Sequence, residues 1–151
     1  CGISWVGVTD IRLLYSLNAD ELRDYAEKFY MPEKVGDPKT DAKQLKETSI
    51  VENAARLKKP VMLAYGGADH TVPAGHGKRL KFELLGSNPD MEWIIYPQEG
   101  HGWSRLKTNL DFWGKVENFL AKHIPPVAPA VKPVPAPTPV STTLPAPVPA
   151  R

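Results

Sequence analysis

Two short apolar runs constrain the fold of this chain more than any other feature of its sequence. The first run, Val61 to Tyr65, ends in Gly66-Gly67, and the second, Trp93 to Tyr96, is stopped by Pro97. Apolar runs of this length are typical of strands buried on both faces, as in parallel sheets covered by helices. The sequence therefore predicts an α/β fold with a mostly parallel sheet and helices on both of its faces.

Amphipathic spacing predicts the helices that cover this sheet. One helix is expected over 74–85, with Gly86 just past its end, and a final helix over 108–123. Thr108 or Asn109 is the expected N-cap of the final helix. The residues expected on its apolar face are Leu110, Trp113, Val116 and Leu120.

The first part of the chain is expected to add one strand and further helices. Residues 1–8 read as a buried strand, and residues 20–30 as an amphipathic helix. Residues 31–41 are interrupted by proline and glycine, which favours a loop. Short helices are expected over 41–48 and 50–57.

The composition changes sharply near Ile124. Residues 125–151 hold 10 of the 16 prolines, and a run so rich in proline can form neither a helix nor a central strand. We expect an extended polyproline II or disordered tail there. The predicted organisation is therefore a partial catalytic domain over residues 1–124, followed by a tail over residues 125–151.

The charge balance argues against several classes of partner. The net charge is +2, and the tail contributes Lys132 and Arg151 without any acid, so the body is close to neutral. A neutral body has no electrostatic footprint for nucleic acid or for an anionic membrane. No apolar run is long enough to span a bilayer. Cys1 is the only cysteine, so no internal disulfide is expected.

Chemically useful side chains follow both apolar runs. Asp69 lies in the loop after the first run, and His101 lies in the loop after the second. The carboxyl ends of parallel strands meet at one edge of a sheet, so these two side chains are expected to lie close together. A neutral imidazole can take a proton from a hydroxyl nucleophile, and a carboxylate on its other nitrogen fixes the tautomer. The sequence thus predicts the acid and the base of a catalytic triad.

The serine of such a triad is missing from this sequence. In α/β-hydrolases the serine precedes the acid and the histidine, usually as G-x-S-x-G. The nearest match, Gly2 to Val6, lacks the second glycine, and Ser104 follows His101 instead of preceding it. We therefore expect an upstream portion of the same polypeptide to supply the nucleophile, and we expect this chain alone to be inactive.

Several blocks of sequence resemble the C-terminal end of the catalytic domain of the prolyl oligopeptidase family, in its acylaminoacyl-peptidase-like or dipeptidyl-peptidase-like branch. The resemblance covers roughly residues 1–124. The blocks are Gly7-Val8-Thr9-Asp10, Gly36-Asp37-Pro38, Pro60-Val61-Met62-Leu63, Gly66-x-x-Asp69-x-x-Val72-Pro73, Tyr96-Pro97-x-Glu99-Gly100-His101-Gly102-Trp103 and the ending Asn109 to His123.

This resemblance implies an α/β-hydrolase fold and serine-type hydrolysis of peptide substrates. It also implies that Asp69 is the triad acid and His101 the triad base, that a serine elbow lies upstream, and that an N-terminal β-propeller restricts access. The chain departs from the family at Tyr65, where a histidine is common, and at Ile50, where Ser-Pro is usual instead of Ser-Ile.

Other candidate residues have two interpretations each. Trp103 is expected to be a packing residue, with lining of the substrate pocket as the alternative. Glu99 could tune the histidine, although a solvated loop carboxylate is the favoured interpretation. Asp69 with His70 and His76 could suggest a metal site, but no H-E-x-x-H motif or cysteine cluster supports it. No metal and no cofactor are therefore expected, and His76 is expected in the first turn of a helix.

Two competing functions remain beside the serine peptidase. A carboxylesterase or lipase of the α/β-hydrolase type would use the same acid and base on an ester. A non-catalytic truncated chain would instead bind a partner, with the proline-rich tail as one candidate surface. Homo-oligomerisation is left open by the sequence.

Overall fold

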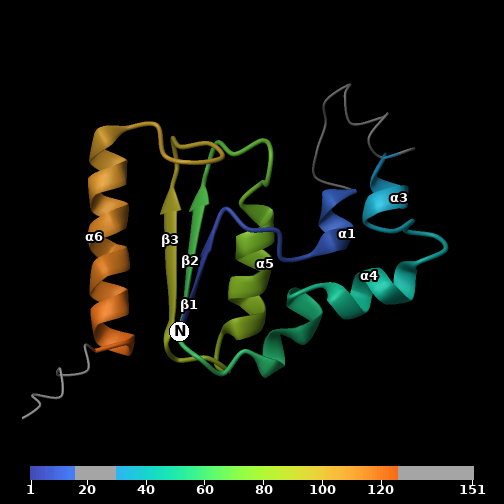
Figure 1. Cartoon of the computed structure of the whole chain (residues 1–151), viewed down its shortest axis with the longest axis horizontal. Coiled ribbons are helices and arrows are strands. Elements are labelled where there is room, and N and C mark those ends of the chain that lie inside the picture. The colour runs from blue at the N-terminus through green and yellow to red at the C-terminus, as the bar shows by residue number, and fades with distance from the viewer. Residues whose placement is uncertain (16–29, 126–151) are drawn as a thin grey trace, which may run out of the picture.

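The computed structural model describes residues 1–15 and 30–125, and a parallel three-stranded sheet lies at its centre (Figure 1). The strands are β1 (Gly2–Trp5), β2 (Val61–Gly66) and β3 (Met91–Tyr96), in the order β1-β2-β3. β2 and β3 pair along their whole length, from Val61 opposite Met91 to Gly66 opposite Tyr96. The predicted α/β fold with a parallel sheet is confirmed.

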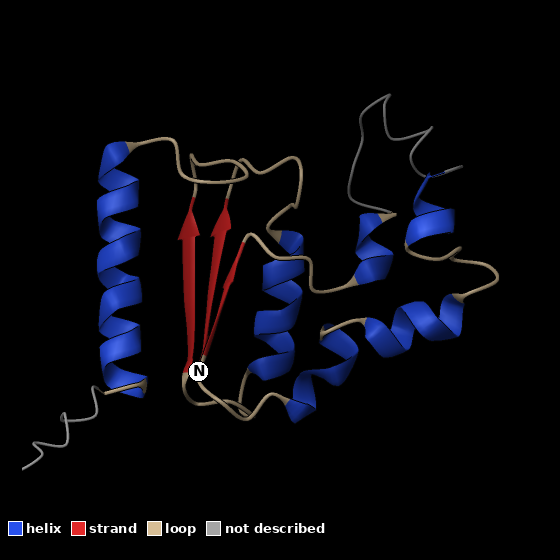
Figure 2. Ribbon diagram, in the orientation of Figure 1, coloured by secondary structure: helices blue, strands red, loops and turns tan. Residues whose placement is uncertain are grey.

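Helices cover both faces of the sheet, as the ribbon in Figure 2 shows. Helix α5 (Gly75–Leu84) connects β2 to β3 on one face, and α6 (Leu106–His123) lies on the other. The prediction of a helix over 74–85 is confirmed to within one residue, and Gly86 follows it with φ +76°. The remaining elements are α1 (Ile11–Leu14), α3 (Met31–Lys34), α4 (Ala42–Thr48) and the 3-10 helix η2 (Val51–Arg56).

The predictions for the first part of the chain have mixed outcomes. The helix expected over 41–48 is confirmed, and the one expected over 50–57 is a 3-10 helix. The loop expected over 31–41 contains the short helix α3. The helix expected over 20–30 lies, except for its last residue, outside the described residues, and the tail beyond residue 125 lies outside them as well.

The prediction of a buried strand over 1–8 was wrong in length and in burial. β1 has only four residues, and the side chains of Ile3 and Trp5 are 37% and 39% exposed. The strand ends because Val6 adopts φ +46°, which breaks the extended backbone. Its residues are exposed because β1 is the sheet edge and, among the described strands, pairs with β2 alone.

The predicted start and apolar face of the last helix were also wrong. α6 begins at Leu106 with Arg105 as N-cap, and the Asn109 side chain instead donates to the carbonyl oxygens of Trp103 and Arg105. Of the residues expected on the buried face, only Val116 is buried. Exposed members of the expected face are Leu110, Trp113 and Leu120, while the residues that pack on the sheet are Phe112, Val116 and Phe119.

β2 carries the core because it is buried on both faces. Leu63 and Tyr65 point into a cluster that packs with α5 and η2, whereas Met62 and Ala64 point into a cluster that packs with α6. All four are completely buried. Alternation of side chains along an extended strand produces these two half-cores, one on each face of the sheet.

Tyr65, a departure from the family pattern, is tied into this core by its hydroxyl and by its ring. The hydroxyl donates to the carbonyl oxygen of Gly7 at 2.7 Å, and the ring stacks on Trp93 at a centroid distance of 5.6 Å. Burial raises the pKa of the Tyr65 phenol, so it stays a hydrogen-bond donor. The residue thus joins β2 to the segment that follows β1.

Within the described part of the chain, no helix is long and apolar enough to cross a membrane.

Candidate active site

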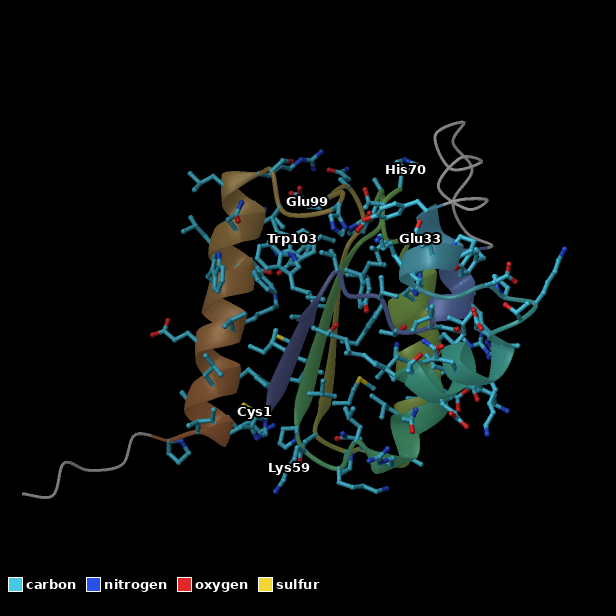
Figure 3. All side chains as sticks on the ribbon, turned by 45° about the vertical axis from the view of Figure 1, so that its right-hand side comes forward. Cys1, Glu33, Lys59, His70, Glu99 and Trp103 are labelled. Atoms are coloured by element: carbon cyan, nitrogen blue, oxygen red, sulfur yellow. The ribbon has the colours of Figure 1, made fainter. Side chains whose placement is uncertain are left out.

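The loops that follow β2 and β3 are joined to each other by their backbones. The N–H of Gly67 donates to the carbonyl oxygen of Tyr96 at 2.8 Å, and the N–H of Ala68 donates to that of Glu99 at 2.9 Å. Figure 3 shows Glu99 and His70, one from each loop, at the same end of the sheet. The prediction that the two strand ends bring their loops together is therefore confirmed.

Asp69 is held in the first loop by two backbone donors. Its Oδ1 atom accepts from the N–H groups of Thr71 and Val72, both at 2.8 Å. Its Oδ2 atom lies 3.0 Å from Nδ1 of His101. The residue is only 5% exposed, so a carboxylate here depends on these donors instead of on water. The two oxygens of Asp69 therefore differ in role, because Oδ1 fixes the loop while Oδ2 meets the imidazole.

His101 lies in a tight turn of the second loop. The N–H of Gly102 donates to the carbonyl oxygen of Gly100 across the histidine at 2.9 Å, and Gly102 has φ +122°, which favours glycine. This turn exposes 42% of the imidazole while its Nδ1 faces Asp69. A carboxylate can only accept, so Nδ1 carries the proton and Nε2 is left as the acceptor of the neutral ring.

The Nε2 atom of His101 has no hydrogen-bond partner among the described residues. An exposed imidazole with its Nδ1–H bound to a carboxylate is set up to take a proton at Nε2. Asp69 then stabilises the imidazolium that forms. This arrangement can serve as a general base toward a hydroxyl group and as a general acid toward a leaving group.

Neither candidate serine of the chain has a hydroxyl directed at this imidazole. The hydroxyl of Ser104 donates to the Oε2 atom of Glu99 at 2.9 Å, and that of Ser4 bonds to the phenol of Tyr65. That neither serine is the nucleophile stays a prediction.

Glu99 corrects the favoured sequence interpretation of a solvated loop carboxylate. Its side chain is 1% exposed, and its Oε2 atom accepts from the N–H and the hydroxyl of Ser104. Hydrogen bonds from the Thr108 hydroxyl and from backbone N–H groups lower the pKa of Glu99 to about 2. The prediction failed because the donors follow Glu99 in the chain, and the bend that brings Ser104 back to its carboxylate has no signal in the sequence pattern. An acid a few residues before a helix is the signal that could have indicated this role.

Trp103 lies in the core between α6 and the sheet, and Figure 3 shows it below Glu99. It is 9% exposed, and its ring contacts those of Tyr96 and Phe112 at centroid distances of 4.9 and 5.5 Å. Packing is the role that these contacts support. Lining of a substrate pocket by Trp103 stays a prediction.

His70 and His76 do not form a site with Asp69. His70 is exposed, whereas His76 is completely buried in the first turn of α5, as predicted. The Nδ1 atom of His76 faces the N–H groups of Thr9 and Asp10 at 3.5 Å. Among the described residues, no group of three or more metal-ligating side chains comes together.

Buried Asp10 is a structural residue that the sequence indicated only as the end of the Gly7 to Asp10 block. It is completely buried, caps α1 by accepting from the N–H of Arg12 at 3.0 Å, and pairs with Arg79 of α5 at 2.6 Å. A buried carboxylate is stable only with such partners. Asp10 therefore ties the segment after β1 to the helix that follows the Asp69 loop.

Known proteins match this chain over most of its length. The model of the prolyl oligopeptidase family matches residues 1–126. Dipeptidyl aminopeptidase BIII of Pseudoxanthomonas mexicana is 30% identical over 124 residues, which are 81% of this chain and 18% of that protein. Acyl-protein thioesterase 1 of Gibberella zeae is 40% identical over 89 residues, which are 58% of this chain and 33% of that protein.

Solved structures share the fold. A puromycin-hydrolyzing peptidase of Mycobacterium tuberculosis superposes with a TM-score of 0.72 at 21% sequence identity, covering 82% of this chain and 18% of that one. The chain thus spans 18% of the length of the peptidase relatives, and it shares the α/β-hydrolase fold of the solved structures. Because the family model matches residues 1–126, far more than half of the chain, the chain belongs to the prolyl oligopeptidase family.

Proposed function

We propose that this chain carries the acid, Asp69, and the base, His101, of a serine peptidase that hydrolyses peptide bonds through a Ser-Asp-His triad. The observation that carries the proposal is the 3.0 Å contact between Oδ2 of Asp69 and Nδ1 of His101, in a ring that is 42% exposed. Family membership supports peptide hydrolysis as the reaction.

The reaction follows from the proton positions in this pair. Nε2 of His101 takes the proton of the serine hydroxyl as its oxygen attacks the peptide carbonyl carbon. Asp69 stabilises the imidazolium, which then gives the proton to the leaving amine as the C–N bond breaks. In the second half, Nε2 takes a proton from water, the hydroxide adds to the acyl-enzyme, and the serine oxygen leaves with that proton.

The nucleophilic serine belongs, in this proposal, to a polypeptide segment outside these 151 residues. The edge of β1 that is unpaired among the described strands supports an additional segment, because an exposed apolar surface lies beside it. This surface is formed by Trp5 of β1 and Trp113 of α6, whose ring centroids are 5.9 Å apart. Both rings are partly exposed, at 39% and 54%. A strand pairing with β1 would cover this apolar surface and would place a further strand end beside the two loops.

A fluorophosphonate probe tests the proposal, because it labels only a serine that is activated by a base. In the complete polypeptide, we expect the labelled peptide to lie outside this chain, and we expect labelling to require His101. Labelling of Ser4 or Ser104, or full labelling of the His101→Ala variant, would contradict the proposal. The exposed His70→Ala variant is the matched control.

Ester hydrolysis is the second candidate, because the fungal thioesterase is 40% identical over 89 residues. The acid and base chemistry is the same for both reactions, so the leaving group has to distinguish them. The complete polypeptide is assayed with a peptide amide and with an ester that share one acyl group. Turnover of both substrates supports the peptidase, whereas turnover of the ester alone favours the esterase.

A further inference from the structure

Glu99 contacts the catalytic loops in two different ways. Through its backbone, the carbonyl oxygen of Glu99 accepts from the N–H of Ala68, the residue before Asp69. Through its side chain, Oε2 accepts from Ser104 N–H at 2.8 Å and from the Ser104 hydroxyl at 2.9 Å. One residue therefore holds the loop that carries the acid and also the segment that follows the base.

The side-chain contacts of Glu99 with Ser104 close the short loop that contains His101. His101 lies between Glu99 and Ser104 in sequence, so bonding these two residues fixes both ends of its loop. The turn within the loop is set by the Gly102 to Gly100 backbone bond. Two features therefore hold the imidazole relative to Asp69. The Glu99 carboxylate fixes the ends of the loop, and the glycine turn sets the backbone on either side of His101.

The negative charge of the Glu99 carboxylate strengthens the hydrogen bonds that it accepts. The hydroxyl of Thr108, the N–H and hydroxyl of Ser104 and the N–H of Arg105 lower the pKa of Glu99 to about 2, and they outweigh burial, which raises it. Hydrogen bonds to an ionised acceptor are roughly twice as strong as neutral ones. The donors also lie at the start of α6, where an anion is favoured by the helix dipole.

We propose that Glu99 is a positioning residue of the triad, whose buried carboxylate holds the His101 loop at the separation from Asp69 that the Nδ1–Oδ2 bond requires. This inference rests on the proposed function. Glu99 acts through His101 and does not touch the substrate. Its loss should therefore lower kcat and leave KM nearly unchanged.

The test compares Glu99→Gln with Glu117→Gln in the complete polypeptide. Glu117 is an exposed acid on α6, so it controls for the loss of one negative charge. A small misplacement of a catalytic group can cost on the order of 10²-fold in rate. We expect Glu99→Gln to lower kcat on the order of 10- to 100-fold, with KM within about twofold of wild type. We expect Glu117→Gln to match wild type.

A spectroscopic readout separates positioning from general destabilisation. The Nδ1 proton of His101, bonded to Asp69, should give a low-field proton resonance that is absent in His101→Ala. We expect Glu99→Gln to shift or broaden this resonance at a temperature where its circular dichroism equals that of wild type. An unchanged resonance together with a wild-type kcat would overturn the inference.

A second set of variants keeps the test decisive if Glu99→Gln fails to fold. Ser104→Ala and Thr108→Val each remove one donor and leave the carboxylate in place. We expect graded losses of kcat, with the largest loss in the double variant, and a wild-type kcat in that variant would overturn the inference. Asp69→Asn serves as the reference: if it is inactive while Glu99→Gln is fully active, the positioning role fails and the triad stands. If Asp69→Asn is itself fully active, the proposed function fails.

Discussion

Gly66 passes so close to Gly100 that a Cβ atom on Gly66 would lie 2.2 Å from the carbonyl oxygen of Gly100. The same Cβ would lie 2.4 Å from the carbonyl oxygen of Glu99. Gly66 is the last residue of β2, and both carbonyls belong to the loop that carries His101. The absence of a side chain at Gly66, and at Gly67 beside it, where a Cβ would lie 2.6 Å from Cα of Pro97, lets the histidine loop cross the end of β2 and reach Asp69.

Substitution of Gly66 by alanine should therefore separate the two loops. Backbone carbonyls cannot move aside as a flexible side chain can, so the His101 loop has to shift. We expect Gly66→Ala to lower kcat of the complete polypeptide on the order of 10²-fold. Gly114→Ala, at a site in α6 where a Cβ would meet no atom within 4 Å, is the control. Equal activity of the two variants would contradict this account of the loop crossing.

Substitution by alanine should change the stability of the protein in opposite directions at two glycines within helices. Alanine in a helix interior is normally favoured over glycine by about 0.5–1 kcal/mol. Gly114→Ala should therefore stabilise the protein by this amount. At Gly77 in α5, by contrast, a Cβ would lie 2.2 Å from the ring of Tyr65. Overpacking of this kind costs about 1–3 kcal/mol, so we expect Gly77→Ala to be destabilising on balance.

Thermal unfolding of the complete polypeptide checks this pair of substitutions. A higher melting temperature for Gly114→Ala and a lower one for Gly77→Ala are expected. A Tyr65→Leu change in the Gly77→Ala background should recover only part of the loss, because it removes the nearer ring that the new Cβ meets and leaves that of Trp93, which the Cβ would approach to 2.7 Å. Stabilisation by Gly77→Ala alone would contradict the observed contact with Tyr65.

The sequence allowed the sheet and the loops that bring Asp69 and His101 together to be predicted because β2 is buried on both faces. A strand in that position needs apolar residues throughout, so the run from Val61 to Tyr65 is unambiguous. The position of Asp69 and His101 then follows from the rule that parallel strands end at one edge. These features depend on local sequence and on sheet geometry alone.

The buried face of α6 could not be predicted in the same way, because two apolar stripes share the helical spacing. One stripe contains Leu110 and Trp113, and the other contains Phe112, Val116 and Phe119. Periodicity alone cannot say which of the two faces the sheet, and the structure shows that the second one does. The burial of Glu99 was mispredicted for a different reason: its carboxylate is bonded by Ser104, five residues later in the chain, and this contact depends on a loop bend that periodicity does not reveal.

Buried His76 should make stability depend on pH. Burial lowers the pKa of His76, and the carboxylates of Asp10 and Asp69 offset this only in part. The folded state therefore favours the neutral ring, while the unfolded chain binds a proton near pH 6.5. The stabilisation is present above that pH and is lost as the pH falls through it toward the lower pKa of the folded state.

Replacement of His76 tests this pH dependence. In His76→Asn the amide oxygen can take the place of Nδ1 as the acceptor for the N–H groups of Thr9 and Asp10. We expect the loss of melting temperature between pH 7 and pH 5 to be smaller in this variant than in wild type. The exposed His70→Asn variant serves as the control. An identical pH dependence in His76→Asn and wild type would contradict the assignment.

The most direct test of the catalytic pair is the kcat of Asp69→Asn in the complete polypeptide, measured on a peptide amide beside the control Asp90→Asn. Asparagine keeps the size of the side chain but can present its amide N–H₂ to Nδ1 of His101, which favours the wrong tautomer. We expect kcat to fall about 10⁴-fold in Asp69→Asn, and we expect exposed Asp90→Asn to keep wild-type activity. A kcat for Asp69→Asn within a few-fold of wild type would contradict the assignment of Asp69 as the acid that orients His101.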